Sequence, residues 1–348
     1  MSLASAAEPL VSASALQACL GELSFQRGNA DDTARALRVL IDARLDRLPL
    51  PGRGATRERW RALGAVAAFD LALVKLYEGH TDALAILAEL DEEHHASNEA
   101  WGVWAAEPPN ARLAAIGNPE SDDVLLHGVK AWCSGAASVT HALVTAWNER
   151  GEPMLAAVDI RQPGVKVTRE GWFAVGMQAS ASVDVHFDNV PARRIGKPGS
   201  YVERPGFWQG GAGIAACWFG AAAGIARFVE KGARRGADPY KLAHLGAIDT
   251  TLCATAALLR ETAAFIDREP QANAMLAAMR ARLAAERCAA HVIEHAGRAL
   301  GAAPLCRDDH FAHLMADLPV FIRQSHAERD EASLAEHLLE REPDSWKV

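Results

Sequence analysis

The chain carries the stretch SVDVHFDNVP at residues 182–191, in which apolar and polar side chains alternate. Val183, Val185 and Phe187 fall on one face of an extended backbone and the polar residues on the other, which is the pattern of a half-buried β-strand. Other runs of similar texture occur at residues 124–132, 142–147 and 154–160. Because no helical pattern separates these runs, they predict an antiparallel sheet or small barrel in the middle of the chain.

Helical periodicity flanks this region on both sides. Between Trp60 and Leu90, apolar residues recur every three or four positions, which predicts two packed helices with a break near Gly79. After Pro205 the chain becomes helical again, with long patterns at residues 214–228, 242–266, 272–300 and 308–339. Helices of this length with short connections predict a four-helix bundle.

Together these patterns predict an α+β fold that is mostly α. We expect an N-terminal helical domain at residues 1–98, a central antiparallel β-domain at 99–200 and a C-terminal four-helix bundle at 201–348. The order of helices, sheet and bundle is unusual, and it therefore restricts the choice of fold.

Composition excludes several classes of protein. Half of the 348 residues are apolar, 23% are charged, and the formal net charge is −8, which argues against a nucleic-acid-binding protein with a basic face. The six cysteines are scattered without ligand spacing, so we expect no metal site, no disulfide framework and a cytoplasmic location. Residues 1–10 show no signal-peptide pattern, and the apolar run at 212–226 is too short to predict a membrane span.

Four motifs resemble those of the acyl-CoA dehydrogenase family, and they occur in the family's order. The first is GVWAAEP at residues 102–108, which is similar to the "TEP" strand that lines the flavin. The second is GVKAWCSGA at 128–136, which resembles G-x-K-x-W-I-T-N-A. The third joins GMQAS at 176–180 to the strand quoted above, and resembles G-x-R-x-S-x-T followed by V-x-F-D-x-V-x-V-P. The fourth is Arg307-Asp308, similar to the "R-D" pair before the family's catalytic segment.

The resemblance implies the family's fold and FAD as the cofactor, held between subunits. An isoalloxazine ring needs a flat apolar wall and hydrogen-bond donors near N1, O2 and N5, because hydride accepted at N5 leaves negative charge near N1. By resemblance, Trp132 and Ser134 supply such a wall and a hydroxyl for N5. Trp104 and Ala106 of the first motif would line the same ring.

Two more cofactor contacts are implied at positions that match less well. Arg235 lies near the family arginine that reaches the FAD pyrophosphate of a neighbouring subunit, a task that suits a guanidinium group. Gly297 lies where the family has a second cofactor-contacting turn. The family's R-x-x-F-G and Q-x-x-G-G-x-G patterns are absent at these places. A solvated arginine at a helix end is the alternative for Arg235.

The catalytic base of the family has no clear counterpart. A dehydrogenase of this family uses a carboxylate beside the flavin to remove the α-proton of an acyl thioester. In an ungapped alignment Ala316 takes the place of that glutamate, and Asp317 is one residue away, about 100° of helix rotation. Ile214 occupies the position that supplies the base in some other members. Asp317 is therefore the acidic candidate.

Imidazole groups form a second set of candidates. The run YEGHT at residues 77–81 superficially resembles the family's E-G-T segment, and His80 within it would act if its helix presents it to the flavin. His310 and His313 follow the R-D pair. A helix-end histidine that is bonded to a neighbour is the alternative for His80.

These residues leave three functions open. The first is FAD-dependent α,β-oxidation of an acyl-CoA or a similar acyl substrate, with an unidentified electron acceptor. The second is a flavin-dependent monooxygenase on the same fold, which receives reduced flavin from a reductase and uses histidines rather than the glutamate. The third is a degenerate member that binds flavin or acyl groups without turnover. By resemblance, and from the Ala- and Gly-rich bundle, we expect a homodimer or homotetramer.

Overall fold

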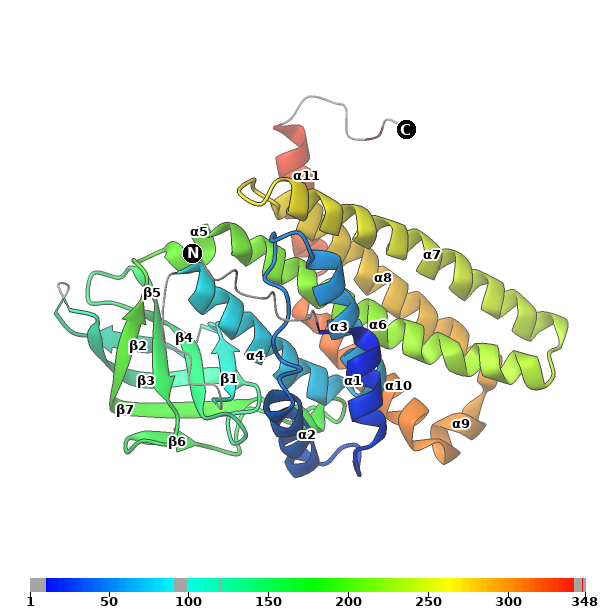
Figure 1. Cartoon of the computed structure of the whole chain (residues 1–348), viewed down its shortest axis with the longest axis horizontal. Coiled ribbons are helices and arrows are strands. Elements are labelled where there is room, and N and C mark those ends of the chain that lie inside the picture. Colours follow the sequence, from blue (N-terminus) through cyan, green and yellow to red (C-terminus); the bar gives the residue numbers. More distant parts are fainter. Residues whose placement is uncertain (1–10, 91–98, 110, 119–120, 341–345, 347–348) are drawn as a thin grey trace, which may run out of the picture.

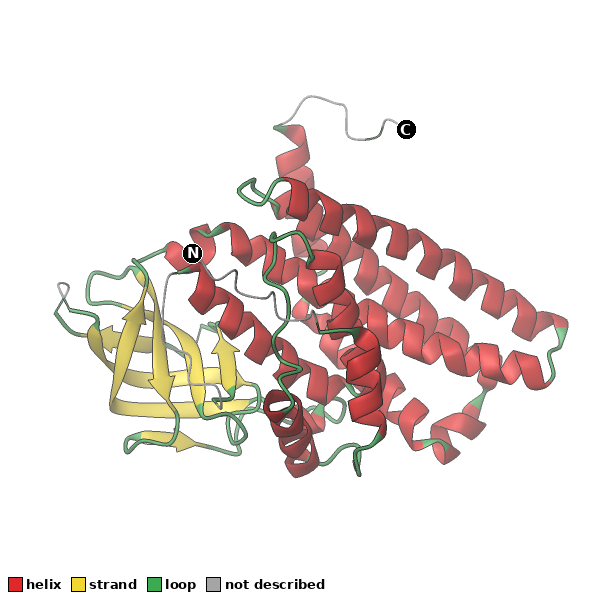
Figure 2. Cartoon of the chain, viewed as in Figure 1, coloured by secondary structure: helices red, strands yellow, loops and turns green. Residues whose placement is uncertain are grey.

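The computed structural model describes residues 11–90, 99–109, 111–118, 121–340 and 346. It places a sheet domain at one end of the molecule and a bundle of long helices at the other, with the N-terminal helices lying between them (Figure 1, Figure 2). The predicted boundary between residues 98 and 99 lies at the edge of a stretch, 91–98, that is outside the described residues. Residues 1–10, where we expected no signal peptide, are also outside the described residues.

Four helices form the N-terminal part: α1 (Ala13–Gly21), α2 (Ala30–Asp42), α3 (Thr56–Phe69) and α4 (Leu71–Glu89). The predicted break near Gly79 is wrong, because α4 runs without interruption through that residue. The break lies at Asp70, whose extended backbone stops α3 and whose side chain accepts the Leu73 N–H at 2.8 Å to cap α4. An acidic N-cap, rather than a glycine, separates the two helices.

The β-domain holds seven strands: β1 (Trp101–Trp104), β2 (Leu113–Ile116), β3 (Asp123–Cys133), β4 (His141–Trp147), β5 (Pro153–Asp159), β6 (Val165–Val167) and β7 (Val183–Ile195). The pairing runs β4-β2-β3-β7-β5 and returns from β5 to β4, which closes a small barrel. The expectation of a wholly antiparallel sheet is wrong, because β1 and β2 pair with β4 in parallel. Between β1 and β4 in the sequence lies the antiparallel pair of β2 and β3.

The C-terminal part holds α5 (Ser200–Glu203), α6 (Pro205–Arg235), α7 (Pro239–Arg268), α8 (Met275–Leu300), α9 (Ala302–Arg307), α10 (Asp309–Phe321) and α11 (Glu328–Leu339). The helix expected at 308–339 is in fact two helices, separated by a short 3₁₀ turn at Ile322–Gln324. Helix α6 crosses α3 where Gly220 meets Gly64. A Cβ atom on Gly220 would lie 2.4 Å from the Gly64 Cα, so this crossing requires glycine.

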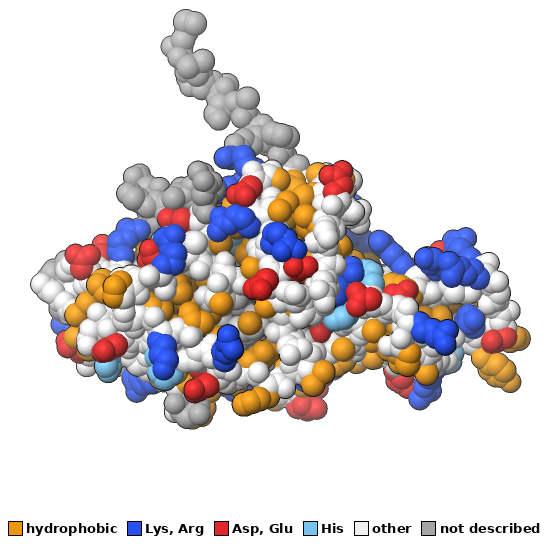
Figure 3. Space-filling model, turned by 90° about the horizontal axis from the view of Figure 1, so that it is seen from below, with side chains coloured by type: hydrophobic (Ala, Val, Ile, Leu, Met, Phe, Trp, Pro, Cys, Tyr) orange, Lys and Arg blue, Asp and Glu red, His pale blue; other side chains and the backbone are white. Residues whose placement is uncertain are grey.

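Helices α6 and α7 are both long and apolar enough to cross a membrane by length and composition. In the fold, 78% of the apolar window of α6 is buried, so α6 is the central helix of the core. Only 17% of the corresponding window of α7 is buried. The face of the molecule drawn in Figure 3 intersperses acidic and basic side chains with hydrophobic ones.

Candidate functional site

A cavity of about 790 Å³ lies where the β-domain, α4, the first half of α6 and the last helices meet. Its walls come from segments far apart in the sequence. The β-domain contributes Trp104, Ala106, Trp132 and Ser134, among others. The structure therefore brings four of the six residues that the resemblance assigned to the cofactor to one wall of one cavity.

Trp132 is the most exposed of the large aromatic side chains on this wall. It has 51% of its surface exposed and a left-handed backbone with φ of 56°, at an irregularity where β3 shifts register against β7 between Lys130 and Cys133. Trp104 packs behind the wall and donates from Nε1 to the Ser134 carbonyl oxygen at 3.1 Å. The irregularity thus turns one indole out into the cavity, while the other holds the strand end in place.

A buried lysine anchors the loop that follows β1. Lys130 is 1% exposed and donates from Nζ to the Thr145 carbonyl oxygen at 2.8 Å and to Glu107 at 3.3 Å. Glu107 also accepts from Trp147 Nε1 at 2.9 Å. Burial lowers the pKa of Lys130, and the Glu107 carboxylate opposes that shift. These contacts fix the loop with Ala106 against the barrel, so Lys130 positions the cavity wall.

Three serine hydroxyls continue the same wall in an unbroken chain. Ser134 Oγ lies 2.8 Å from Ser182 Oγ, and Ser182 Oγ lies 3.0 Å from Ser180 Oγ. Ser180 Oγ donates to the Met177 carbonyl oxygen at 2.8 Å. Ser180 and Ser182 are buried, whereas Ser134 is partly exposed to the cavity.

Helix α4 presents charged residues to the same cavity. Lys75, Glu78 and Asp82 all line it, because spacings of three and four residues place them on one helix face. The Glu78 carboxylate lies 3.5 Å from Lys75 Nζ. Burial raises the pKa of Glu78, with the lysine acting in the opposite direction. A carboxyl group with a raised pKa inside a cavity is suited to proton transfer.

The structure does not bring His80, the candidate that the sequence offered in this segment, to the cavity. His80 is two residues from Glu78, about 200° around the helix, and it points away from the cavity. Its Nδ1 accepts the Trp101 backbone N–H at 3.2 Å, so the ring proton lies on Nε2, which contacts Asp46 Oδ2 at 3.0 Å. His80 therefore joins α4 to β1 and to the loop before α3.

The other catalytic candidates lie on α10, and the structure does not bring them to the cavity wall. Asp317 Oδ1 accepts the Met177 N–H at 2.5 Å, and burial raises the pKa of Asp317. His313 Nδ1 lies 3.2 Å from the Asp309 carboxylate on the same helix. His310 Nε2 donates to the Ala68 carbonyl oxygen at 2.9 Å, and burial lowers its pKa. Asp317 and His310 hold α10 against neighbouring segments, whereas the contact of His313 lies within the helix.

The positions where the family carries its base hold no acid. Ile214 does line the cavity, at the first half of α6. Ala316 packs its carbonyl oxygen against Gly176, where a Cβ atom would lie 2.0 Å away. Gly176 is therefore required for the segment around Met177 to approach α10.

Arg235 and Gly297 lie outside the cavity. Arg235 is in the last turn of α6, 21 residues beyond Ile214, which corresponds to about 30 Å along a helix. Gly297 is in the last turn of α8, which meets the cavity near its beginning at Met279 and Arg282. Within one chain, neither residue reaches a ligand in the cavity.

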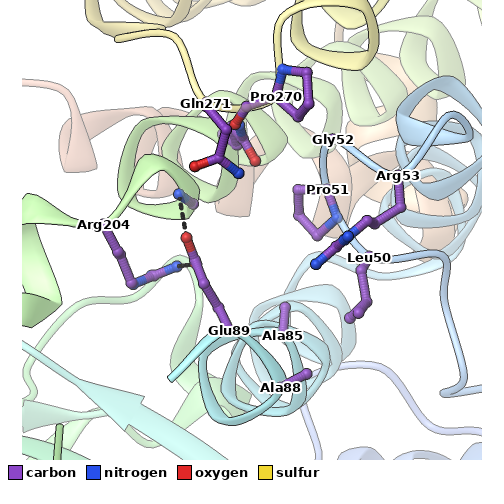
Figure 4. Close-up of a pocket in the computed structure, with 12 residues that line it drawn as sticks. Leu50, Pro51, Gly52, Arg53, Ala85, Ala88, Glu89, Arg204, Pro270 and Gln271 are labelled. Atoms are coloured by element: carbon purple, nitrogen blue, oxygen red, sulfur yellow. Dashed lines mark hydrogen bonds and ion pairs between the residues drawn. The ribbon is translucent and has the colours of Figure 1, made fainter. Parts of the chain in front are cut away.

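Three arginines line the cavity: Arg204, Arg282 and Arg323. Arg282 is half-buried, donates to the carbonyl oxygens of Gly211 and Gln324 at 3.0 and 3.2 Å, and lies over the Trp218 ring. Burial lowers the pKa of Arg282. Arg204 donates to Glu89 at 2.7 Å, and this pair borders a second hollow of about 90 Å³ between α4 and α6 (Figure 4). Arg204 lines both spaces.

Aromatic side chains gather at the junction of α5 and α6. Tyr201 and Phe207 meet edge to face at 5.5 Å, and Phe207 and Trp208 do so at 5.3 Å. Trp172 enters the cavity from the loop between β6 and β7 and donates from Nε1 to the Met177 carbonyl oxygen at 3.2 Å. Among the residues that the structure describes, no group of three or more His, Cys, Asp or Glu is arranged to hold a metal ion.

Comparison with known proteins identifies the fold but no sequence relative. No protein-family model matches the chain, and no curated protein sequence matches it. Dibenzothiophene monooxygenase TdsC from Paenibacillus sp. A11-2 superposes with a TM-score of 0.75 at 20% identity, over 95% of this chain and 96% of that one. The same enzyme is also known in complex with FMN and indole.

Two other solved structures are similar to the same extent. Methanesulfinate monooxygenase MsuC from Pseudomonas fluorescens has a TM-score of 0.76 at 16% identity, over 97% of this chain and 99% of that one. KijD3, solved with FMN and a dTDP-linked amino sugar, has a TM-score of 0.77 at 19% identity, over 96% of this chain and 93% of that one. The chain thus has the acyl-CoA dehydrogenase-like fold that these flavin enzymes share.

Proposed function

We propose that the chain is a flavin-dependent monooxygenase whose cavity holds the isoalloxazine ring against Trp132 and an apolar, aromatic substrate against the aromatic side chains of α5 and α6. The observation that carries this proposal is the wall of Trp104, Ala106, Trp132 and Ser134 on a cavity of about 790 Å³. Flavin-bound neighbours on the same fold support it, and so does the naming of two of them as monooxygenases.

The residues present fit a flavin ring. An indole with 51% of its surface exposed inside a cavity offers a flat apolar face that a planar ligand would cover. Ser134 lies two residues along the same strand end and adds one polar contact at the edge of that face. When bound, a flavin would supply two-electron transfer and, in its reduced form, reaction with dioxygen.

Oxygen insertion is favoured over acyl-CoA oxidation because no residue at the positions expected for the catalytic base is suited to remove a proton. Ile214 and Ala316 cannot remove a proton, and the Asp317 carboxylate is committed to the Met177 N–H. A monooxygenase needs no base at the α-carbon of a thioester. It needs an enclosed place for the substrate, and the aromatic cluster of Tyr201 and Phe207 offers one beside the wall.

Glu78 is the residue we propose for proton transfer. Its carboxyl group lines the cavity and lies 3.5 Å from Lys75 Nζ, and burial raises its pKa toward the range of a general acid or base. Glu78 would take the proton of a hydroxyl or amino group of the substrate as the aromatic ring of that substrate is oxidised. The same residue is what favours acyl oxidation as the second candidate function, with Glu78 in place of the family's base.

The form of the flavin and the assembly belong to the same proposal. Arg235 and Gly297 are remote from the cavity of their own chain, so FAD would require a second protomer, whereas FMN would need only the wall. We propose a homodimer or homotetramer in the cytoplasm, supported by the apolar window of α7, of which 17% is buried in the single chain. Light scattering at micromolar concentration tests the assembly, and a monomer would contradict it.

The deciding experiment starts from the purified protein reconstituted with FMN or FAD. Chemically reduced, flavin-loaded protein is mixed with ¹⁸O₂ and indole as the aromatic probe, and the products are read by mass spectrometry. Transfer of one labelled oxygen atom to indole supports the proposal. Anaerobic bleaching of oxidised flavin by a mixed acyl-CoA pool would establish the second candidate instead. Failure of both flavins to bind would overturn both functions.

A further inference from the structure

The direction of each hydrogen bond in the serine chain is determined by counting hydrogens. Three oxygen–oxygen contacts of 2.8, 3.0 and 2.8 Å link Met177, Ser180, Ser182 and Ser134. Neutral oxygen atoms at these distances need a hydrogen between them. The three hydroxyl groups supply one hydrogen each, and the Met177 carbonyl supplies none. Each contact must therefore use one hydroxyl hydrogen.

Only one arrangement satisfies this count. The Met177 contact must use the hydrogen of Ser180, because the carbonyl can only accept. The contact between Ser180 and Ser182 must then use the hydrogen of Ser182. The remaining contact must use the hydrogen of Ser134. The reverse orientation would leave two lone pairs facing each other among buried groups, at the cost of a hydrogen bond.

The consequence for the cavity is that Ser134 presents lone pairs to it. Its only hydrogen is used in the contact with Ser182, which lines the same wall, so the Ser134 oxygen is left to accept from a ligand. A flavin ring changes character at N5, which accepts a hydrogen bond when the ring is oxidised and donates one when it is reduced. An acceptor at this point of the wall therefore complements the reduced ring.

We infer that Ser180 and Ser182 are positioning residues that hold the Ser134 hydroxyl as an acceptor, so that the site binds reduced flavin more tightly than oxidised flavin. This inference rests on the proposed function, because it places the ring edge of a flavin at Ser134. Both serines line the same wall as Ser134. Both are buried, at 1% and 4% exposure, and they act through the direction of one hydrogen.

The experiment measures affinity in both redox states, with FMN and with FAD. The wild type and Ser182→Ala are titrated with oxidised flavin by fluorescence and with reduced flavin under anaerobic conditions. Removing the Ser182 oxygen frees the Ser134 hydrogen, which then turns to the cavity and donates to oxidised N5. We expect the ratio of the oxidised to the reduced dissociation constant to fall about tenfold, the size of one neutral hydrogen bond. The midpoint potential of the bound flavin falls correspondingly by about 30 mV.

Matched variants separate positioning from packing. Ser182→Thr keeps the hydroxyl and should keep the wild-type ratio, and Ser180→Ala should shift it in the same direction by less. A packing defect would weaken both redox forms equally, and threonine would not correct the ratio. An unchanged ratio in Ser182→Ala, with both forms still bound, overturns the inference and leaves the proposed function standing. Failure of the wild type to bind any flavin overturns the proposed function and the inference together.

Discussion

The β-domain wall and helix α10 were both expected to serve the flavin, and the structure treats them differently. The wall brings Trp104, Trp132 and Ser134 to the cavity. Helix α10 turns Asp317 and His313 to structural contacts instead. A cofactor platform and a catalytic segment are thus separable parts of one fold, and the first can persist in a chain where the second has been rebuilt.

Asp317 on α10 has a second buried acid, Asp70, as an electrostatic neighbour. Asp70, at the start of α4, is 3% exposed, and burial raises its pKa to about 6, with the Asp317 charge acting in the same direction. The pKa of an aspartate in the unfolded chain is near 3.9, so between about pH 4 and pH 6 the folded protein keeps a proton that the unfolded chain has released. The stability that this proton contributes is fully present below about pH 3.9 and is lost as the pH rises through 6.

The largest expected effect is a pH-dependent difference in the free energy of unfolding between the wild type and Asp70→Asn. Asp70→Asn keeps an acceptor for the Leu73 N–H but removes the titration. Relative to the wild type, the variant should gain about 3 kcal/mol in the free energy of unfolding between pH 4 and pH 7. Urea denaturation at several pH values measures this gain. A difference that stays constant with pH would show that Asp70 does not carry a raised pKa.

Glu78→Gln tests whether α4 has taken over the role that α10 lacks. The substitution keeps the size and polarity of the side chain but removes proton transfer, so turnover should fall about a hundredfold. The affinity for flavin should stay within about twofold, because the substitution leaves Trp132 and Ser134 of the wall unchanged. Rates at saturating substrate and fluorescence titrations provide the two measurements. Full activity in the variant would remove Glu78 from the mechanism.

Trp132→Ala tests the wall itself. Loss of the exposed indole face should weaken flavin binding by about 2 kcal/mol, or thirtyfold. Phe173→Ala is the matched control, because this ring is 94% exposed and does not line the cavity. Equal flavin affinities in the two variants would place the ring elsewhere. Circular dichroism checks that both variants are folded.

The smallest effect is expected on α10. Asp317→Asn keeps an oxygen that accepts the Met177 N–H, and the residue is outside the cavity wall, so turnover should change less than about threefold. A loss of turnover approaching that of Glu78→Gln, at unchanged stability, would restore Asp317 as the base. It would also show that α10 has kept the catalytic role that we assign to α4.

Much of the fold followed from local patterns. Strand alternation and helical periodicity identified the central sheet and the long C-terminal helices, because both patterns are set by neighbours in sequence. The break at Asp70 was missed, although an aspartate before an apolar run is a recognisable cap. The parallel pairing of β1 with β4 had no local signal, because it joins segments that are about 40 residues apart.

In the candidate site too, some features had a local sequence signal and others did not. Trp132 and Ser134 could be selected from one motif because they are two residues apart at the end of β3, which carries both of them to the cavity. Glu78 and His80 share a helix and differ only in which side faces the cavity, a phase that depends on how α4 packs against β1 and α6. Composition and motif spacing do not predict how α4 packs against β1 and α6.

The sequence by itself therefore determined the elements and one wall of the cavity, because periodicity and short motifs act over a few residues. Only the tertiary structure decided that Glu78 faces the cavity, that His80 and Asp317 hold other segments together, and that three serines form one directed chain. These relations depend on close packing between distant segments, where burial and hydrogen-bond geometry decide the role of each side chain.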